Sequence, residues 1–232
     1  SPQAAHCLAE ARTIVGYPLY VDLVPPAYLE GKTVLTTGMR HEMDRCNAAI
    51  DAALSGSRTA VVCSGDSGIY GMSGLVLELL EQRGLHPHVP LEIIPGIPAV
   101  CAAAALLGAP LMHDFACISL SDLLTPWESI TARLHAAFSA DFVVVLYNPR
   151  SRGRDWQLGH ALDIARTYRG EETPVGIVRK AYRPDQSVSL SPLHTVAPDT
   201  VDMLSIVVIG KSSTRILGQY MLTPRGYPVK KS

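Results

Sequence analysis

One strand, one glycine-rich loop and one helix between residues 59 and 80 constrain the fold of this chain more than any other feature. Residues 59–63 are β-branched or apolar, as in a buried strand. From Met72 to Leu80 the apolar residues recur at helical spacing. The loop between them contains Gly65, Asp66, Gly68 and Gly71. This order is typical of α/β proteins, in which small molecules bind at the carboxyl ends of strands, but a glycine-rich connection without a ligand is the alternative.

The same alternation of strand and helix runs through the first half of the chain and predicts a parallel sheet with helical crossovers. Strands are expected at residues 13–17, 34–36 and 91–94, and helices at residues 1–11, 42–54 and 98–107. A helix that leads directly into the strand at 13–17 is an unusual start for such a domain, because the strand expected before that helix is absent. We therefore expect the first sheet to lack its N-terminal strand.

The alternation restarts after residues 108–113, so we predict two α/β domains, residues 1–112 and residues 113–232. Strands are expected at residues 116–120, 142–147, 175–178 and 205–210, and helices at residues 126–139 and 155–168. Residues 188–190 and 194–196 are expected to pair as antiparallel strands. The fold class predicted is therefore α/β, with a ligand cleft between the two domains.

Composition excludes several classes of protein. The net charge of −1 gives no electrostatic basis for binding nucleic acid. The longest apolar run, around residues 99–107, is too short to span a membrane. The five cysteines are scattered and form no CxxC pair, so we expect reduced thiols in a cytoplasmic protein. His86 and His88 have a metal-like spacing without a third ligand, so we expect no metal site.

Four turns that contain glycine or proline follow expected strands, and parallel strands would bring them to one edge of a sheet. They are residues 64–66, 95–99, 147–149 and 210–214. The chain has neither a Walker lysine motif nor the dinucleotide GxGxxG pattern. Backbone amides with a single acidic residue suit a ligand that carries a ribose or an amino group.

These blocks resemble the tetrapyrrole (precorrin) methyltransferase family, whose members use S-adenosylmethionine and consist of two α/β domains. Residues 64–71 are similar to the family's signature loop, although the family more often has proline at the position of Ser67, and residues 95–99 are similar to its second cofactor loop. Further matching blocks are residues 15–23, 119–127, 147–152 and 223–227. The resemblance covers essentially the whole chain. It implies methylation at C17 of precorrin-3B, or of its cobalt form, with ring contraction in cobalamin biosynthesis.

The resemblance also implies roles for individual residues. It places cofactor contacts on Gly65, Asp66, Ile69, Pro98, Ala99, Asn148, Ala181 and Gly210. A tetrapyrrole carries many carboxylates, which arginine recognises well, so Arg150 and Arg152 are expected at the substrate. Tyr17 is expected to contact the substrate as well. Asp66 can alternatively fix a turn, and the arginines can form a solvated surface. No acid–base residue is assigned, because the candidates, His41, His113, Asp114 and Tyr17, are each more often structural.

Several expectations are less specific. Family members begin with a strand and a glycine-proline-glycine loop before the first helix, and this segment is missing here. A homodimer is implied by the resemblance alone. The alternative functions are a non-catalytic binder of tetrapyrrole or S-adenosylmethionine, and a methyltransferase of the same fold with another substrate.

Overall fold

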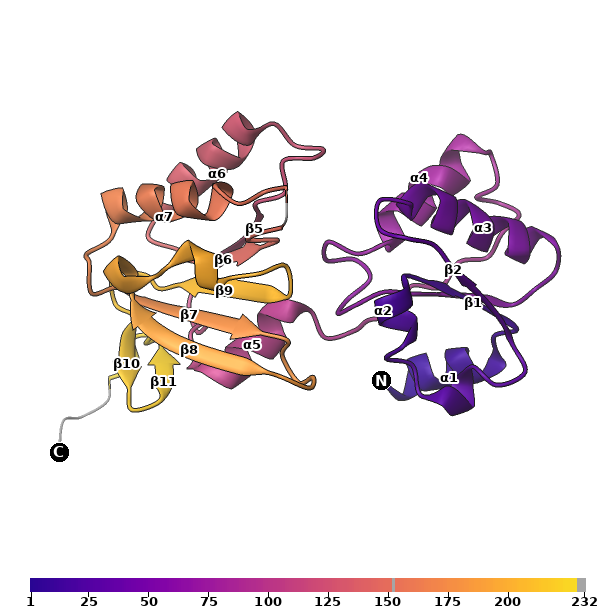
Figure 1. Ribbon diagram of the computed structural model, residues 1–232, viewed down its shortest axis with the longest axis horizontal. Helices are drawn as coiled ribbons and strands as arrows, with labels where there is room; N and C mark the ends of the chain where they lie inside the picture. The colour runs from indigo at the N-terminus through magenta and orange to yellow at the C-terminus, as the bar shows by residue number, and fades with distance from the viewer. Residues whose placement is uncertain (152, 229–232) are drawn as a thin grey trace. The chain divides into compact units, whose positions relative to one another are not determined.

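The computed structural model describes residues 1–151 and 153–228, which fold as two units, Ser1–Pro98 and Ala99–Ser232 (Figure 1). Both units combine helices with a sheet, as the predicted α/β class requires. The boundary falls before helix α5 (Ala99–Leu107), whereas the sequence predicted it after residue 112. The physical reason is that α5 buries Val100, Ala103 and Leu107 in the same cluster as residues of the second unit's sheet.

The first unit is built on a parallel three-stranded sheet with the order β2-β1-β3. Strand β1 is central and all four of its residues are buried. The strands are β1 (Thr13–Gly16), β2 (Thr33–Thr36) and β3 (Thr59–Val62). The helices are α1 (Pro2–Glu10), α2 (Pro18–Val21), α3 (Glu42–Leu54) and α4 (Ser73–Gln82), with a 3-10 turn at Pro26–Tyr28.

The helices of the first unit cover both faces of its sheet (Figure 1). Helices α3 and α4 lie on one face and share a buried cluster, in which Cys46 and Ile50 pack with Leu79 and Leu80. Helix α1 lies on the opposite face. The predicted start of α1 is confirmed, because the hydroxyl of Ser1 accepts a 3.2 Å hydrogen bond from the amide of Ala4.

Residues 91–94 do not form the predicted strand. The segment is extended but pairs with no strand among the described residues. Leu91 and Ile93 remain about half exposed. The apolar pattern of this segment is that of a strand, but a strand needs a neighbour with which to form hydrogen bonds, and none lies beside it.

The second unit contains a five-stranded mixed sheet with the order β5-β6-β9-β7-β8. Strands β5 and β6 are parallel, whereas β9 runs antiparallel to both β6 and β7. The strands are β5 (Phe115–Ser119), β6 (Val143–Tyr147), β7 (Pro174–Arg179), β8 (Ser187–Pro192) and β9 (Ser205–Ile209). The prediction of parallel strands therefore holds for the first unit, whereas in the second unit's five-stranded sheet β5 and β6 pair in parallel and the other pairs are antiparallel.

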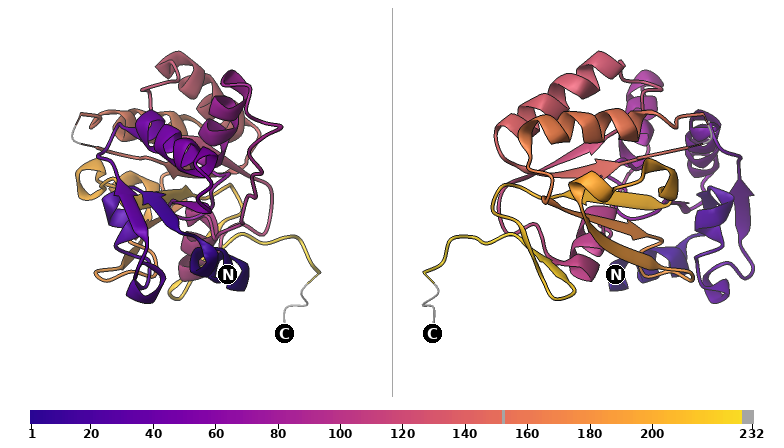
Figure 2. Two further views of the ribbon diagram at one scale, coloured as in Figure 1. Left: turned by 90° about the vertical axis from the view of Figure 1, so that its right-hand side faces the viewer. Right: turned by 60° about the vertical axis from the view of Figure 1, so that its left-hand side comes forward.

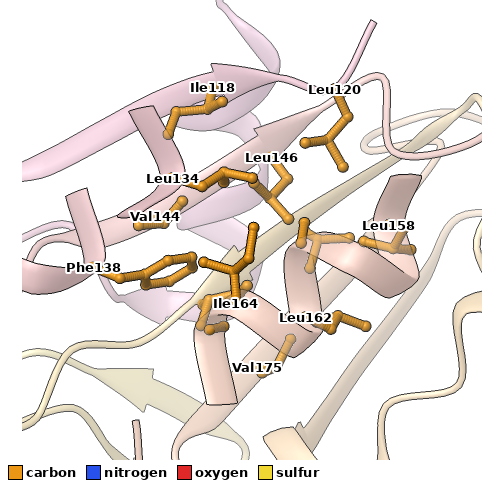
Figure 3. Packing of buried hydrophobic residues seen from close by; sticks show 14 of the residues in the cluster. Ile118, Leu120, Leu134, Phe138, Val144, Leu146, Leu158, Leu162, Ile164 and Val175 are labelled. Carbon is orange, nitrogen blue, oxygen red and sulfur yellow. The ribbon is translucent and has the colours of Figure 1, made fainter. Parts of the chain in front are cut away.

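Helices α6 (Trp127–Ser139) and α7 (Gln157–Tyr168) cover one face of this sheet, and α5 lies against the other face (Figures 1 and 2). The larger core lies under α6 and α7. Phe138 and Leu134 of α6 pack there with Leu158 and Leu162 of α7 and with Leu146 of β6 (Figure 3). This core fixes the ends of β5 and β6, where the sequence places several candidate site residues.

The structure differs from the predictions at three smaller elements. Strand β8 pairs with β7, not with residues 194–196, which lie in and directly after a 3-10 turn at Leu193–Thr195. Pro192 ends β8 and the 3-10 turn begins at the next residue, so residues 194–196 do not return alongside β8. The sequence also missed a small sheet of β4 (Gly108–Ala109), β10 (Arg215–Leu217) and β11 (Tyr220–Leu222). A further 3-10 turn spans Pro198–Thr200.

Candidate active site

The glycine loop after β3 has a backbone that favours glycine at one point and leaves no room for a side chain at another. Gly65 has φ +74, in the left-handed region that favours glycine. A Cβ on Gly71 would lie 2.4 Å from the carbonyl oxygen of Ser67. The same carbonyl accepts hydrogen bonds from the amide and the hydroxyl of Ser73, the first residue of α4. The loop is therefore tightly folded and anchored to the helix that follows it.

Asp66 joins this loop to the second predicted cofactor loop. Its Oδ1 accepts a 2.8 Å hydrogen bond from the amide of Gly68, and its Oδ2 accepts a 2.9 Å bond from the amide of Gly96. These bonds, the one from Gly96 foremost, hold the pKa of Asp66 below its ordinary value, so the side chain is ionised at neutral pH. Both carboxylate oxygens already have backbone partners. The structure thus favours the turn-fixing role that the sequence left open for Asp66.

Apolar side chains stand exposed beside these loops. Ile69, a predicted cofactor contact, is 41% exposed, and Ile97 is 71% exposed. Pro98, another predicted contact, ends the first unit and is half-buried. Exposed apolar side chains on two rigid loops provide a surface that a flat organic ligand can cover.

Tyr17 lies at the same edge of the first sheet as Gly65 and Asp66, because β1 and β3 are parallel and both end there. Its ring packs edge-on against Tyr20, with the ring centroids 5.4 Å apart. The guanidinium of Arg45 lies 5.7 Å from the ring centroid of Tyr17. Arg45 is only 4% exposed and donates to the carbonyl oxygens of Thr37 and Gly38, which follow β2. The structure therefore brings four predicted residues, Tyr17, Gly65, Asp66 and Ile69, into one region of the first unit.

Asn148 follows β6 in the second unit and adopts a left-handed conformation with φ +50. Its side-chain amide donates a 2.9 Å hydrogen bond to the hydroxyl of Ser119 at the end of β5. Its carbonyl oxygen accepts a 2.9 Å bond from Arg154, whose Nη1 also donates to Ser121. Arg154 is 6% exposed, and burial lowers its pKa. A buried cation thus holds Asn148 in an uncommon backbone conformation.

Ala99 and Ala181 belong to the same region as Asn148. The hydroxyl of Tyr147 accepts a 2.9 Å hydrogen bond from the amide of Val100, in the first turn of α5, directly after Ala99. Ala181 packs against the cluster that contains Val100 and Tyr147. It follows β7, whose end lies at the same sheet edge as the end of β6. Three predicted cofactor residues of the second unit are therefore brought together.

Gly210 does not share this edge. Strand β9 is antiparallel to β6, and its last residue, Ile209, pairs with Val144 near the beginning of β6. Gly210 therefore lies at the opposite end of the sheet from Asn148. There its carbonyl oxygen accepts a hydrogen bond from the buried side chain of Arg169. The antiparallel direction of β9 overturns the expectation that the turn at residues 210–214 gathers with the other three, whereas the cofactor contact that the resemblance implies for Gly210 stays a prediction.

The arginine predictions have mixed outcomes. Arg150 donates a 2.6 Å hydrogen bond to the carboxylate of Asp199 and a 3.1 Å bond to the carbonyl oxygen of Pro198. Its cation therefore already has an acidic partner, although that partner is 88% exposed. Arg152 lies outside the described residues.

The acid–base candidates have different surroundings in the two units. His113 and Asp114 precede β5, at the opposite end of the sheet from Asn148. His41 lies 2.7 Å from Asp44 at the beginning of α3. No group of three His, Cys, Asp or Glu residues that could hold a metal ion occurs among residues 1–151 and 153–228.

The cysteines of the described chain are all free thiols. Burial raises the pKa of Cys46 to about 11 and raises that of Cys63 and Cys117. These three thiols are therefore protonated at neutral pH and are poor nucleophiles.

Sequence reasoning missed two residues that shape the site. Tyr147 begins one of the blocks that resemble the family and Arg154 lies just beyond that block, but the sequence indicates no role for either residue. The position of both beside Asn148 was visible in the sequence. Their contacts with α5 and with Ser121 depend on packing that the sequence does not display.

The comparisons with known proteins agree with this architecture. The family described as Tetrapyrrole (Corrin/Porphyrin) Methylases matches residues 1–197. The chain belongs to this family.

Its relatives are more specific. The chain is 48% identical to the probable cobalt-factor III C(17)-methyltransferase of Salmonella typhimurium, covering 97% of this chain and 92% of the relative. It is 39% identical to the precorrin-3B C(17)-methyltransferase of a Sinorhizobium species, covering 98% and 91%. Cobalt-factor III methyltransferase of Priestia megaterium is 45% identical, but the chain spans only 42% of its length.

A solved structure shares the whole fold. The crystal structure of the methyltransferase CobJ superposes with a TM-score of 0.92 at 39% identity, covering 97% of this chain and 93% of that one. A uroporphyrin-III C-methyltransferase from Thermus thermophilus, complexed with S-adenosylhomocysteine, superposes with a TM-score of 0.66. At 20% identity, that second likeness shows the fold alone.

Proposed function

We propose that this chain is an S-adenosylmethionine-dependent methyltransferase that methylates C17 of precorrin-3B or cobalt-factor III and contracts the ring, in cobalamin biosynthesis. The observation that carries the proposal is the near full-length similarity to relatives named for this reaction. The site contributes a second argument, because it contains rigid glycine loops and exposed apolar side chains that can orient a flat ligand. Such a site suits a reaction in which orientation provides most of the catalysis.

Methyl transfer from a sulfonium is an in-line displacement, in which the nucleophilic carbon must lie behind the methyl group and water must be excluded. When bound, S-adenosylmethionine supplies the activated methyl group. The residues present fit this cofactor. Ile69 offers an apolar surface for the adenosyl part, and the backbone of the loop at Gly65 can approach closely because it carries no Cβ. Asp66 holds the two loops of the first unit in register.

In the second unit we propose that Ala99, Asn148 and Ala181 contact the cofactor, and that Pro98 does so from the first. Arg150 and Tyr17 are proposed to bind the substrate, as is Arg152. For Arg150 the proposal implies an exchange, in which a carboxylate of the macrocycle replaces the exposed carboxylate of Asp199. The cofactor contact that the resemblance implies for Gly210 stays a prediction.

The test is direct. The protein is incubated with S-adenosylmethionine and either precorrin-3B or cobalt-factor III, and the products are analysed by mass spectrometry. One added methyl group on either substrate supports the proposal, and the preferred substrate distinguishes the cobalt-dependent from the cobalt-free reaction. Titration calorimetry with S-adenosylhomocysteine separates the alternatives: binding without turnover of either substrate favours a non-catalytic binder.

We also propose that the protein is a cytoplasmic homodimer. The first part rests on the free cysteines and on the finding that none of the described helices is long and apolar enough to cross a membrane. The second is supported by apolar side chains on the surface of the second unit, where Leu123 and Leu124 are 67% and 99% exposed. Sedimentation equilibrium tests it, and a mass of one chain at micromolar concentration contradicts it.

A further inference from the structure

Three arginine side chains are buried in the described chain, Arg45, Arg154 and Arg169. The carboxylate of Asp141 lies 3.4 Å from Arg169, and the negative charge of Asp122 opposes the lowering of the pKa of Arg154. Arg45 differs from both, because it forms no ion pair with any Asp or Glu among the residues that the structure describes. A buried charge without a counter-charge is costly, so the surroundings of Arg45 need an explanation of their own.

Arg45 also has N–H donors without an oxygen partner. Its Nη2 donates to the carbonyl oxygens of Thr37 and Gly38, at 3.0 and 2.9 Å. In the described part of the chain, its Nη1 has only the sulfur of Met72 as a partner, at 3.9 Å, and its Nε has none. Because a thioether sulfur is a weak acceptor, Nη1 and Nε both remain available to a stronger one.

The guanidinium of Arg45 lies at the sheet edge where the candidate site is. Strands β1, β2 and β3 are parallel and all end at this edge, which also holds Gly65 and Asp66. The ring of Tyr17, a residue proposed to bind the substrate, has its centroid 5.7 Å from the guanidinium carbon of Arg45. An aromatic ring attracts a cation but carries no net charge, so Tyr17 does not replace a counter-ion.

The group that covers Nη1 of Arg45 is easily moved. Met72 directly precedes α4 and is half-buried. Its side chain is unbranched and flexible, so it can adopt another rotamer without a shift of the helix or the sheet. Displacement of the Met72 sulfur would therefore give a ligand access to Nη1.

We propose that Arg45 binds a carboxylate of the ligand beside the ring of Tyr17, in place of the Met72 sulfur. The inference rests on the proposed function, which provides carboxylates from two sources, the side chains of the tetrapyrrole and the amino-acid end of S-adenosylmethionine. A carboxylate can accept from two guanidinium N–H groups at once, and it supplies the charge that Arg45 lacks. The contact with Tyr17 favours the tetrapyrrole as the source.

The test measures binding without turnover. S-adenosylhomocysteine has no methyl group to transfer, so cobalt-factor III is titrated in its presence and followed by visible absorption. We expect Arg45→Met to weaken the binding of cobalt-factor III at least about tenfold and that of S-adenosylhomocysteine less than about twofold. Arg45→Lys keeps the charge and should recover part of the loss. Ile50→Ala removes buried packing from the same helix but no charge, so both affinities should stay within about twofold of the native values.

The outcomes distinguish the two sources. Weaker binding of S-adenosylhomocysteine with unchanged binding of cobalt-factor III retains the carboxylate site and assigns it to the cofactor. Unchanged affinities for both ligands in Arg45→Met overturn the proposal, as does a native protein that binds neither ligand. Equal losses for both ligands in Arg45→Met and in Arg45→Lys show a purely structural role and also overturn it.

A second variant keeps the test decisive if Arg45→Met does not fold. Met72→Glu places a carboxylate beside Arg45 and fills the site from within the protein. Cobalt-factor III should then bind at least about tenfold more weakly than to Met72→Gln, which carries no charge, and equal binding by these two variants overturns the proposal. Methyl transfer by the native protein tests the proposed function separately. If no methyl group is added but binding still depends on Arg45, the proposed function fails and the carboxylate site stands.

Discussion

Asp66 and Gly96 are joined by a 2.9 Å hydrogen bond between loops that lie 30 residues apart in the sequence. The two loops are in contact at the backbone as well, because a Cβ on Gly96 would lie 1.9 Å from the carbonyl oxygen of Gly65. Neither loop can therefore shift without the other. This coupling makes the loop pair one rigid element rather than two separate connections.

Replacing Gly96 with alanine tests that rigidity. The added Cβ overlaps the carbonyl oxygen of Gly65, so the loops must separate, and we expect a loss of about 1–3 kcal/mol in the free energy of unfolding. Gly74→Ala is the matched control, because nothing lies within 4 Å of its Cβ position in α4. That change should stabilise the protein by about 0.5–1 kcal/mol. Urea unfolding of both variants provides the comparison, and equal stabilities would contradict the contact.

Asp66→Asn removes the negative charge and replaces one carboxylate oxygen with an NH2 group. That group cannot accept the hydrogen bond from the backbone N–H that it then faces, either that of Gly68 or that of Gly96. We expect a lower midpoint of thermal unfolding at pH 7 and weaker binding of S-adenosylhomocysteine. Because the folded-state pKa of Asp66 lies below its ordinary value, the stabilisation by Asp66 is fully present above pH of about 4 and is lost as the pH falls through the folded-state pKa. The difference between native and variant protein should therefore shrink in acid. Asp163→Asn, at an exposed ion pair on α7, serves as the control.

Arg154→Met keeps the aliphatic stem but leaves the carbonyl oxygen of Asn148 without its donor. We expect a loss of about 1–3 kcal/mol in the free energy of unfolding and weaker binding of S-adenosylhomocysteine. Arg154→Lys should restore part of both, since one donor remains. Arg166→Met, at an exposed position of α7, should change stability by less than about 0.5 kcal/mol. If cofactor affinity is unchanged while stability falls, Arg154 does not position the site.

Arg150→Ala tests substrate binding separately from cofactor binding. We expect a higher KM for the tetrapyrrole with an unchanged KM for S-adenosylmethionine. Asp199→Asn frees the Arg150 cation from its partner and should lower the KM for the tetrapyrrole. The ion pair is mostly on the surface, so stability should change by less than about 1 kcal/mol in either variant. Equal changes of both KM values in Arg150→Ala would contradict a substrate role.

Features that depend on residues close together in the sequence were predictable from the sequence. The glycine loop at residues 65–71, the helix that follows it and the capped start of α1 all arise from local spacing and residue type. The family blocks gave the fold and most of the residues that the structure groups around Asn148 and Gly65.

Features that depend on strand order were not predictable. Nothing in the apolar sequence of β9 indicates its direction, and the expectation that the turn at residues 210–214 meets the other turns was wrong for that reason. The role of Asp66 in joining the two loops also depends on its hydrogen bond with Gly96, a residue remote in sequence. Residues 91–94 read as a strand, but pairing depends on a neighbour, which the sequence pattern of the segment does not reveal.

The position of β9 has a consequence for how the second unit folds. This strand is the last of its sheet to be synthesised, yet it lies in the middle, between β6 and β7. Until residue 209 has left the ribosome, β6 and β7 each have an apolar edge without a partner. The sheet then consists of two separate strand pairs, β5 with β6 and β7 with β8. The nascent chain therefore carries open strand edges from the synthesis of β6 until that of β9, which makes prompt arrival of β9 a condition for avoiding aggregation.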